Sequence, residues 1–393
     1  MGWNIPEPLK YEEYKPISWG AVTGAFSALF TLLVTLWTVY YSVTKSTAFF
    51  PIAVFSFGVL LLFFLLILGW RLYRIGIEAE RRKSIDLYNQ ENKIAWQQWA
   101  SKSVGILGIG YIFPRSFPKT FFTHDEEFSI NEDKKISLGN YPGEYIVFRE
   151  LIVSIKHYLD VLPDNVKLEI WLPYENLSQQ SIISAVWSDL DLSHIYIESY
   201  NKLNNYTEQI ASWVDNPDDS IKLVMIPKWS SVNEKESDGL IAWVISPSLT
   251  NKDYNNRFSL YRPMETEYSE LTKPLNDFFF YQQIAVQSTG LWNNKIEQSV
   301  QTEVLMGKHK VSMGAVDKKE SKNSSQPEVY TLSHWLGSHN SYAFWFTMTV
   351  AMLMSEKSQS CQLCLSEENS KLSVGAVSYA VNNNYVNSQN DER

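Results

Sequence analysis

The sequence predicts an α/β fold: an N-terminal transmembrane helical hairpin followed by a layered α/β domain in the cytoplasm. Two long runs without a charged residue, 17–43 and 46–70, predict the hairpin. Alternating strand-like and helix-like segments between about 145 and 246 predict the α/β domain. The composition agrees, because 45% hydrophobic and 14% aromatic residues over 393 positions are more apolar than a disordered chain would be.

Each apolar run can cross a bilayer, since a spanning helix needs about 20 apolar residues. Only Lys45 separates the two charge-free stretches, so both ends of the hairpin are expected on the same side. A cleaved signal peptide has a shorter apolar core, and buried helices of soluble proteins rarely run this far without a charge. The sequence therefore favours two membrane spans over both alternatives.

Basic residues predict which side of the membrane the ends occupy. They gather directly after the second run, whereas the connecting loop has a single lysine. Basic segments stay in the cytoplasm, so we expect a two-pass bacterial inner-membrane protein with 1–16 and the main domain in the cytoplasm. The alternative role for the cluster is binding of anionic lipid. The predicted membrane-interface residues are Trp70, Arg71, Arg74, Arg81, Arg82 and Lys83.

The segment 71–103 is predicted to continue the second span as a juxtamembrane helix, with two tryptophans on one face that dock onto the following domain. Residues 103–114 then contain three glycines spaced G-x-x-G-x-G. A phosphate-binding loop needs a preceding strand and a following helix, and Pro114 and Pro118 break the chain instead. This segment is therefore predicted to be a glycine-containing strand.

The α/β domain is expected over 104–380, with a sub-boundary near 255–275, and 381–393 is expected to be a disordered tail. Helices are predicted at 144–162, 178–189, 205–214, 275–286 and 341–354, the last one fully buried. Strands are predicted at 167–172, 194–198, 221–226, 240–246, 360–365 and 371–379, with a strand pair at 304–315. A turn is predicted at 232–238 and an exposed loop at 317–328.

Candidate chemistry is sparse. Cys361 and Cys364 form one C-x-x-C, but no second pair exists, and residues three apart in a strand point to opposite faces. The segment 334–341 holds His334, Ser338 and His339 as a candidate interaction or vestigial site, although its serines equally suit a helix cap. No nucleophile elbow, phosphate loop or zinc-protease motif occurs. The sequence predicts no catalytic residues, no cofactor and no metal.

The charge limits the partners. A net charge of −9, from 34 basic and 43 acidic residues, argues against nucleic-acid binding. The expected partners are the lipid bilayer and another protein.

The hairpin, the basic helix and the segment AWQQWASKSVGILGIGYIFP at 95–114 together resemble membrane proteins encoded in bacterial type VI secretion clusters, of the lipase-adapter type. That resemblance implies a membrane-anchored, non-catalytic accessory protein that binds a secretion effector or spike component. Rival hypotheses are an immunity protein against a secreted toxin, a structural part of the secretion machine, and an enzyme acting on lipid or acyl substrate at the bilayer.

The C-terminal order of HWLG, apolar helix, strand, turn and strand at 334–379 resembles the last unit of thiolase and ketosynthase folds. Those enzymes need a nucleophilic cysteine in their first half, whereas the first cysteine here is Cys361. The resemblance thus implies a thiolase-like fold in which His334 lies near the former active site without its nucleophile. The sequence prediction is accordingly a protein that is not an enzyme.

Overall fold

The computed structural model describes residues 2–11, 18–48, 50–114, 135–139, 142–164, 166–229, 236–246, 255–315, 327–337, 342–368 and 370–380. The chain forms two compact units, one of Pro6–Ala95 and the other of Met1–Ile5 with Trp96–Arg393. We call them the helical unit and the α/β unit.

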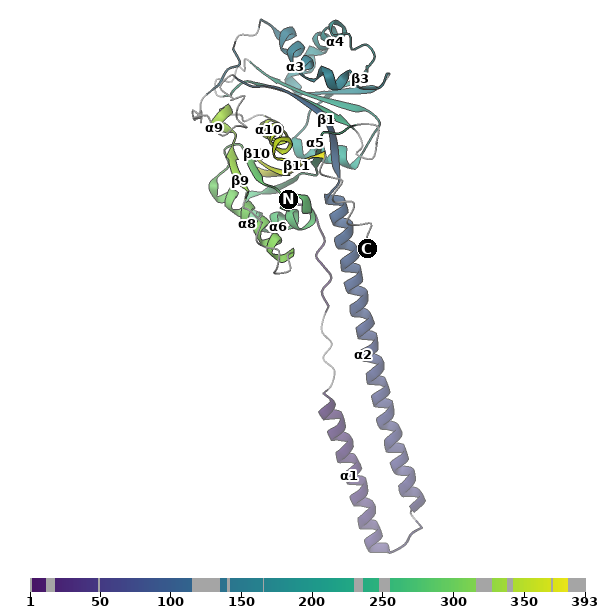
Figure 1. Ribbon diagram of the computed structural model, residues 1–393. Coiled ribbons are helices and arrows are strands. Elements are labelled where there is room, and N and C mark those ends of the chain that lie inside the picture. Colours follow the sequence, from purple (N-terminus) through teal and green to yellow (C-terminus); the bar gives the residue numbers. More distant parts are fainter. Residues whose placement is uncertain are drawn as a thin grey trace. The chain divides into compact units, whose positions relative to one another are not determined.

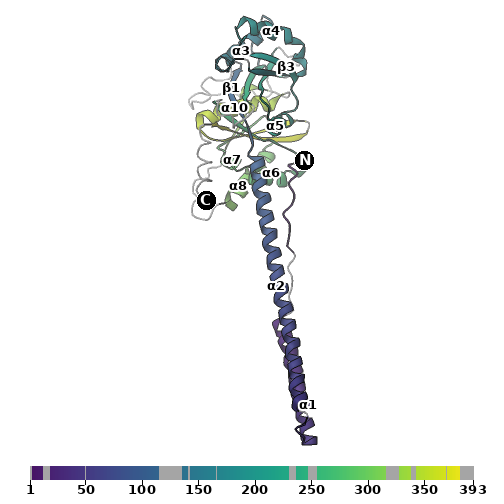
Figure 2. The same ribbon diagram turned by 90° about the vertical axis from the view of Figure 1, so that its right-hand side faces the viewer.

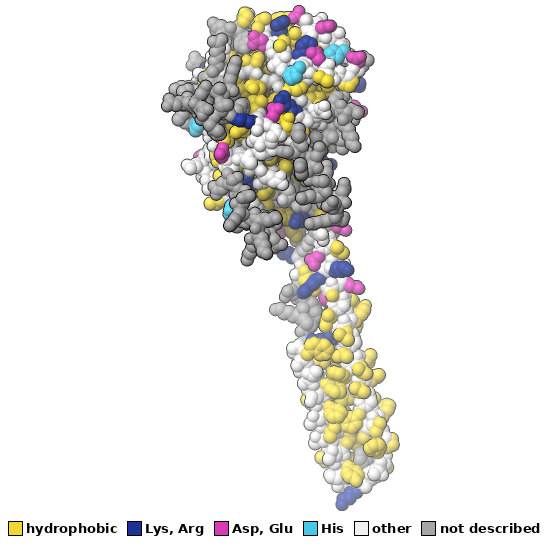
Figure 3. All heavy atoms as spheres, in the orientation of Figure 1, with side chains coloured by type: hydrophobic (Ala, Val, Ile, Leu, Met, Phe, Trp, Pro, Cys, Tyr) yellow, Lys and Arg dark blue, Asp and Glu magenta, His cyan; other side chains and the backbone are white. Residues whose placement is uncertain are grey.

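The helical unit contains α1 (Trp19–Thr44) and most of α2 (Phe50–Ala100), which lie side by side (Figures 1 and 2). Both are long and apolar enough to cross a membrane. Aromatic rings join them, for example Phe26 and Phe64 with centroids 4.3 Å apart. Figure 3 shows hydrophobic side chains over the visible side of the hairpin, with charged side chains at its tip and further along α2. The helix predicted over 71–103 is the continuation of α2.

The α/β unit is built on one mixed sheet of eleven strands. Its order is β3-β2-β4-β5-β1-β6-β11-β10-β8-β9, with β7 paired to β11. The strands are β1 (Ser103–Ile112), β2 (Lys167–Leu172), β3 (Tyr196–Lys202), β4 (Ile221–Lys228), β5 (Gly239–Ser246), β6 (Phe258–Tyr261), β7 (Met264–Glu267), β8 (Gly290–Asn293), β9 (Glu328–Thr331), β10 (Gln362–Glu368) and β11 (Lys371–Tyr379).

The sheet contains the same arrangement twice. The first half runs β3-β2-β4-β5-β1 and the second runs β9-β8-β10-β11-β6, and β1 and β6 pair antiparallel where the halves join. In each half three strands are parallel and are followed by an antiparallel partner, β5 in the first and β11 in the second. The chain therefore folds as two topologically equivalent halves within one sheet.

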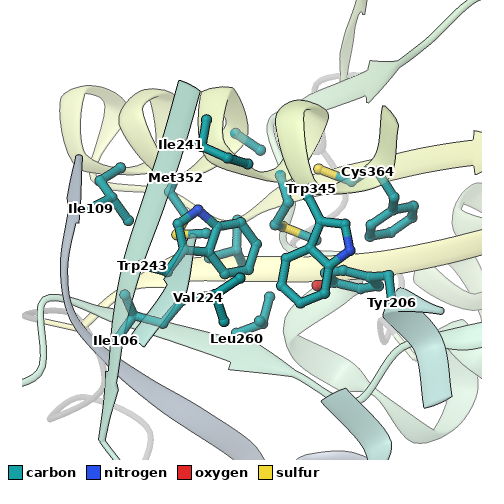
Figure 4. Close-up of a cluster of buried hydrophobic side chains, with 14 of the residues drawn as sticks. Ile106, Ile109, Tyr206, Val224, Ile241, Trp243, Leu260, Trp345, Met352 and Cys364 are labelled. Atoms are coloured by element: carbon teal, nitrogen blue, oxygen red, sulfur yellow. The ribbon is translucent and has the colours of Figure 1, made fainter. Parts of the chain in front are cut away.

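Helices cover the sheet in layers. One core lies between the first half and α3 (Glu144–Leu159) with α4 (Gln180–Asp189), and another lies between the second half and α6 (Thr272–Tyr281) with α8 (Gln298–Ala315). The third core holds α5 (Tyr206–Asp215) and α10 (Ala343–Ser358) between strands of both halves, as the close-up in Figure 4 shows. Shorter helical segments are η1 (Tyr174–Gln179), η2 (Tyr268–Glu270), α7 (Gln283–Val286) and α9 (Ser333–Leu336).

Several sequence predictions are confirmed at the level of single elements. The three glycines lie in strand β1, and the buried helix predicted over 341–354 is α10. The strand pair predicted at 304–315 is wrong, because those residues form the second part of helix α8. Its buried face includes Val300, Val304 and Lys308, spaced four apart, and the lysine at the third of these positions interrupts the apolar spacing that indicates a helix.

Candidate functional site

Of the three residues in the predicted site, one lies in the described part of the structure. His334 is on α9, directly after β9, with its ring 6.2 Å from that of Trp335. Trp335 belongs to an aromatic group with Trp292 and Tyr330, whose rings stack 4.4 Å apart. Ser338 and His339 lie outside the described residues. The structure therefore places His334 at the edge of the second half, beside aromatic side chains.

The two central helices begin next to each other. Tyr206, the first residue of α5, packs on Phe344 and Trp345 of α10, with ring centroids 4.0 and 4.9 Å apart. Trp243 of β5 adds a third contact, 4.8 Å from Trp345, and donates a hydrogen bond of 2.9 Å from Nε1 to Thr349. Figure 4 shows the rings of Tyr206, Trp243 and Trp345 side by side. The amino ends of two helices attract negative charge, but here buried aromatic rings fill the space between them.

The cysteines are buried on different sides of the sheet. Cys364 belongs to the central core around Tyr206, and Cys361 to the outer core that contains α8. Burial raises the pKa of both thiols, that of Cys361 to about 12 despite the nearby Lys308. A thiol nucleophile needs a lowered pKa and access to substrate, so neither cysteine suits that role. Among the described residues no group of three His, Cys, Asp or Glu side chains could hold a metal ion.

A polar cluster lies where the parallel strands of the first half end. We define the edge cluster as Glu175, Lys228, Glu236 and Tyr342. Glu175 follows β2 on η1, Lys228 ends β4, and Glu236 precedes β5. Tyr342 comes from the other half and forms the N-cap of α10 in a left-handed conformation with φ of 60°. The edge cluster thus joins the two halves at the start of a central helix.

Electrostatics in the edge cluster centre on a buried ion pair. Lys228 Nζ lies 2.7 Å from Glu236, and these side chains are only 16% and 4% exposed. The same Nζ is 5.8 Å from the ring centroid of Tyr342, whose hydroxyl donates a 3.4 Å hydrogen bond to Glu175. Burial, together with the Glu175 carboxylate, raises the pKa of Tyr342. The cluster therefore offers a desolvated ammonium group, a protonated phenol and a carboxylate within one region.

The edge cluster was not predicted from the sequence, although the positions of two of its four residues pointed to it. Glu175 and Lys228 closely follow two predicted parallel strands, and ligands of open α/β sheets bind beyond the carboxyl ends of such strands. Glu236 was not predicted as a site residue because its segment, 232–238, has the polar composition of a turn. In the structure its side chain is buried. Tyr342 was read as part of the buried helix.

The predicted membrane-interface residues lie on α2 in the helical unit. Trp70 is 66% exposed and its ring lies 6.3 Å from that of Tyr73. Arg71 lies over the ring of Trp19, and Arg82 over the ring of Tyr11, at 4.0 and 4.5 Å from the centroids. The remaining three, Arg74, Arg81 and Lys83, are exposed along the helix.

No family model matches the chain, and no curated protein matches it. Solved structures do match. OleA of Xanthomonas campestris with bound cerulenin has 11% sequence identity and a TM-score of 0.45, covering 72% of this chain and 99% of that one. The 3-oxoacyl-[acyl-carrier-protein] synthase III of Aquifex aeolicus VF5 has 10% identity and a TM-score of 0.42, covering 70% of this chain and 100% of that one.

These neighbours are thiolase-like, consistent with the thiolase-like fold expected from the C-terminal segments. They also correct one prediction. The sequence offers no catalytic constellation and so predicts a protein that is not an enzyme, and the similar solved structures, a synthase among them, contradict that prediction. The link to type VI secretion and the protein partner stay predictions.

Proposed function

We propose that the chain is a membrane-anchored, thiolase-like enzyme that acts on an acyl ester or thioester at the edge cluster. The observation that carries the proposal is the buried Lys228–Glu236 ion pair beside Tyr342, at the point where the two halves meet. In this cluster burial raises the pKa of Tyr342, and ionisable groups perturbed by burial are typical of sites that move protons or stabilise charge.

Each member of the edge cluster has a role in this proposal. Lys228, which Glu236 holds in place through the ion pair, stabilises the oxyanion that forms when a nucleophile adds to the acyl carbonyl. Glu175 accepts the proton of an attacking water, and Tyr342, whose raised pKa keeps the phenol protonated, donates to the leaving group. The buried thiols of Cys361 and Cys364 take no part.

The two apolar helices of the helical unit favour the proposal that the acyl substrate comes from the bilayer. Two helices that are long and apolar enough to span a membrane would hold the enzyme at its source of acyl lipids, with the α/β unit in the cytoplasm and both termini on that side. Lipid and acyl thioester are the substrate classes that share the reactive carbonyl and a long apolar tail.

The test uses the full chain in lipid nanodiscs with a panel of fatty-acyl thioesters, fatty-acyl esters and phospholipids. We expect turnover of at least one class, a loss of about a hundredfold or more in Lys228→Met and Glu175→Gln, and retained turnover in Cys364→Ala. The matched control is Lys156→Met, which removes a surface lysine paired with Asp160 on α3. A folded wild-type protein that turns over nothing in the panel, or turnover unaffected by Lys228→Met, contradicts the proposal.

A second candidate function is binding of another protein, as predicted for a secretion effector or spike component. Two tyrosines at the open edge of the first half favour it, since Tyr174 is 70% and Tyr196 is 62% exposed, and β3 ends the sheet. Exposed tyrosines supply contact energy at protein interfaces. Purification from detergent with identification of the bound proteins tests this, and capture that survives the change of both tyrosines to alanine contradicts it.

A further inference from the structure

The buried ion pair of the edge cluster is nearly closed to solvent. The side chains of Lys228 and Glu236 are only 16% and 4% exposed, which leaves little room for an acyl carbonyl to reach Lys228 Nζ. The hydrogen-bonded ladder between β4 and β5 ends at the pair of Lys228 with Gly239. Residues 236–238 lie beyond that ladder, so the pairing of these two strands does not fix the position of the Glu236 carboxylate.

Residues 136–138, which we call the strap, lie along residues 236–238. The backbone N–H of Ile136 donates a 3.0 Å hydrogen bond to Ser237 Oγ, and the backbone N–H of Asp238 donates one of 2.9 Å to the carbonyl of Ile136. The strap therefore supplies the hydrogen-bonding partner that β4 does not provide at this point of the chain.

Asp238 makes the remaining contacts with the strap. It is only 1% exposed, and its Oδ2 accepts hydrogen bonds from Ser137 Oγ at 2.8 Å and from the backbone N–H of Leu138 at 3.0 Å. Hydrogen bonds to a carboxylate are stronger than those between neutral groups. Because Asp238 is two residues from Glu236, these bonds also determine where the Glu236 carboxylate meets Lys228.

Two features indicate that the strap can open. The Oδ1 atom of Asp238 is buried and accepts no hydrogen bond from the described residues, so opening of the strap would return this oxygen to water. Gly139 follows the strap in a left-handed conformation with φ of 98°, and the space where a side chain would lie is open. Glycine adopts such angles freely, so the backbone can turn at Gly139 without strain.

We propose that the strap is the gate of the edge cluster. Closed, it fixes Glu236 against Lys228; open, it admits the acyl group to the ammonium group. Asp238 and Ser137 are positioning residues, because they act on Lys228 through Glu236. The substrate in this inference rests on the proposed function, whereas the opening of the strap can be measured without a substrate.

The first test measures acetylation of lysines in the full chain by sulfosuccinimidyl acetate, quantified by peptide mass spectrometry. In wild type, Lys228 should react much more slowly than Lys167 of β2, which is also paired with a glutamate but has a side chain that is 60% exposed. Ser137→Ala should raise the rate at Lys228 about tenfold, the change expected when a hydrogen bond to a carboxylate is lost, and Asp238→Asn should raise it further. The rate at Lys167 should stay the same.

Two variants control for the loss of the hydroxyl group. Ser137→Thr keeps a hydroxyl and should react as wild type does. Ser299→Ala removes an exposed serine of α8 that also donates to a carboxylate, that of Glu297, and should leave the rate at Lys228 unchanged. If Asp238→Asn does not fold, as judged by tryptophan fluorescence, the exposed Ser137 decides through its alanine variant.

The second test measures kinetics with the acyl substrate that wild type turns over. Ser137→Ala should lower kcat about tenfold and change KM less, because Lys228 is then in position for a smaller share of the time. Equal acetylation rates at Lys228 and Lys167 in wild type, or at Lys228 in wild type and Ser137→Ala, overturn the gate. Faster acetylation with an unchanged kcat overturns the positioning role. If wild type turns over nothing, the proposed function is contradicted and the acetylation rates alone decide on the strap.

Discussion

Replacing Gly110 by alanine tests whether α3 is held against β1 as closely as the structure has it. A Cβ atom at position 110 would lie 2.0 Å from Ser154 Oγ and 2.6 Å from Ile155 Cγ2, whereas real Cβ contacts essentially never fall below 3.0 Å. The serine hydroxyl can rotate away. The Ile155 methyl group is close to the helix backbone and its side chain is fully buried, so α3 itself has to shift.

The expected cost follows from overpacking of a dense core. Inserting a methyl group into a well-packed interior costs about 1–3 kcal/mol, because neighbours must leave their preferred rotamers or the backbone must move. Replacing glycine by alanine also reduces the entropy of the unfolded chain, which offsets about 0.4–1 kcal/mol. We therefore expect Gly110→Ala to lower the free energy of unfolding by about 1–2 kcal/mol.

The assay is denaturant unfolding of the full chain in detergent, followed by tryptophan fluorescence. Gly307→Ala is the matched control, since Gly307 lies inside helix α8 and its new Cβ would be 3.5 Å from the nearest atom, an ordinary contact. That variant should gain about 1 kcal/mol, because alanine is the better helix former. The reasoning is refuted by a Gly110→Ala protein that is as stable as Gly307→Ala.

Three further predictions concern buried ionisable groups. In the native protein, Cys361 and Cys364 should resist maleimide and react after unfolding, because burial raises the pKa of both thiols; rapid native labelling contradicts this. Lys308→Met should raise the melting temperature. Its gain over wild type should be larger at about pH 7 than at about pH 10, because burial lowers the pKa of Lys308 from 10.5 and wild type loses stability as pH falls below that value; an equal gain at both pH values argues against it. Arg262→Met should cost about 1 kcal/mol, because the ion pair is lost but the Asp215 carboxylate is 44% exposed and can be solvated. The hydrogen bond from Arg262 lowers the pKa of Asp215 below 3.8, so the difference from wild type in denaturant titrations should disappear as pH falls through that range, and a constant difference contradicts the pairing.

Local patterns in the sequence predicted most individual elements correctly. Asn205 was placed at the start of a helix and does cap α5, where its side chain accepts a hydrogen bond from the backbone of Thr207. The strands over 360–365 and 371–379 pair antiparallel as β10 and β11. These features depend on residues close in sequence, so periodicity and capping chemistry are sufficient to find them.

The repeated strand order could not be predicted in the same way. Pairing of β2 with β4, or of β1 with β6, joins segments far apart in the chain, and no local signal specifies which strands become neighbours. The edge cluster depends on that pairing, since it brings Tyr342 to Glu175. A site assembled from both halves is therefore visible only once the fold is known.

The chemistry that we propose for this chain lies at the edge cluster and not in the central core around α5 and α10. The starts of α5 and α10 meet in the interior, where helix dipoles would stabilise a thiolate, but the sequence places the Tyr206 ring at the start of α5 and the only thiol of that core, Cys364, on a strand. Tyr342 precedes α10 and lies beside the ion pair of Lys228 and Glu236. The ionisable groups at the start of α10 are therefore those of the edge cluster, and the acid–base chemistry that we propose there needs no buried thiol.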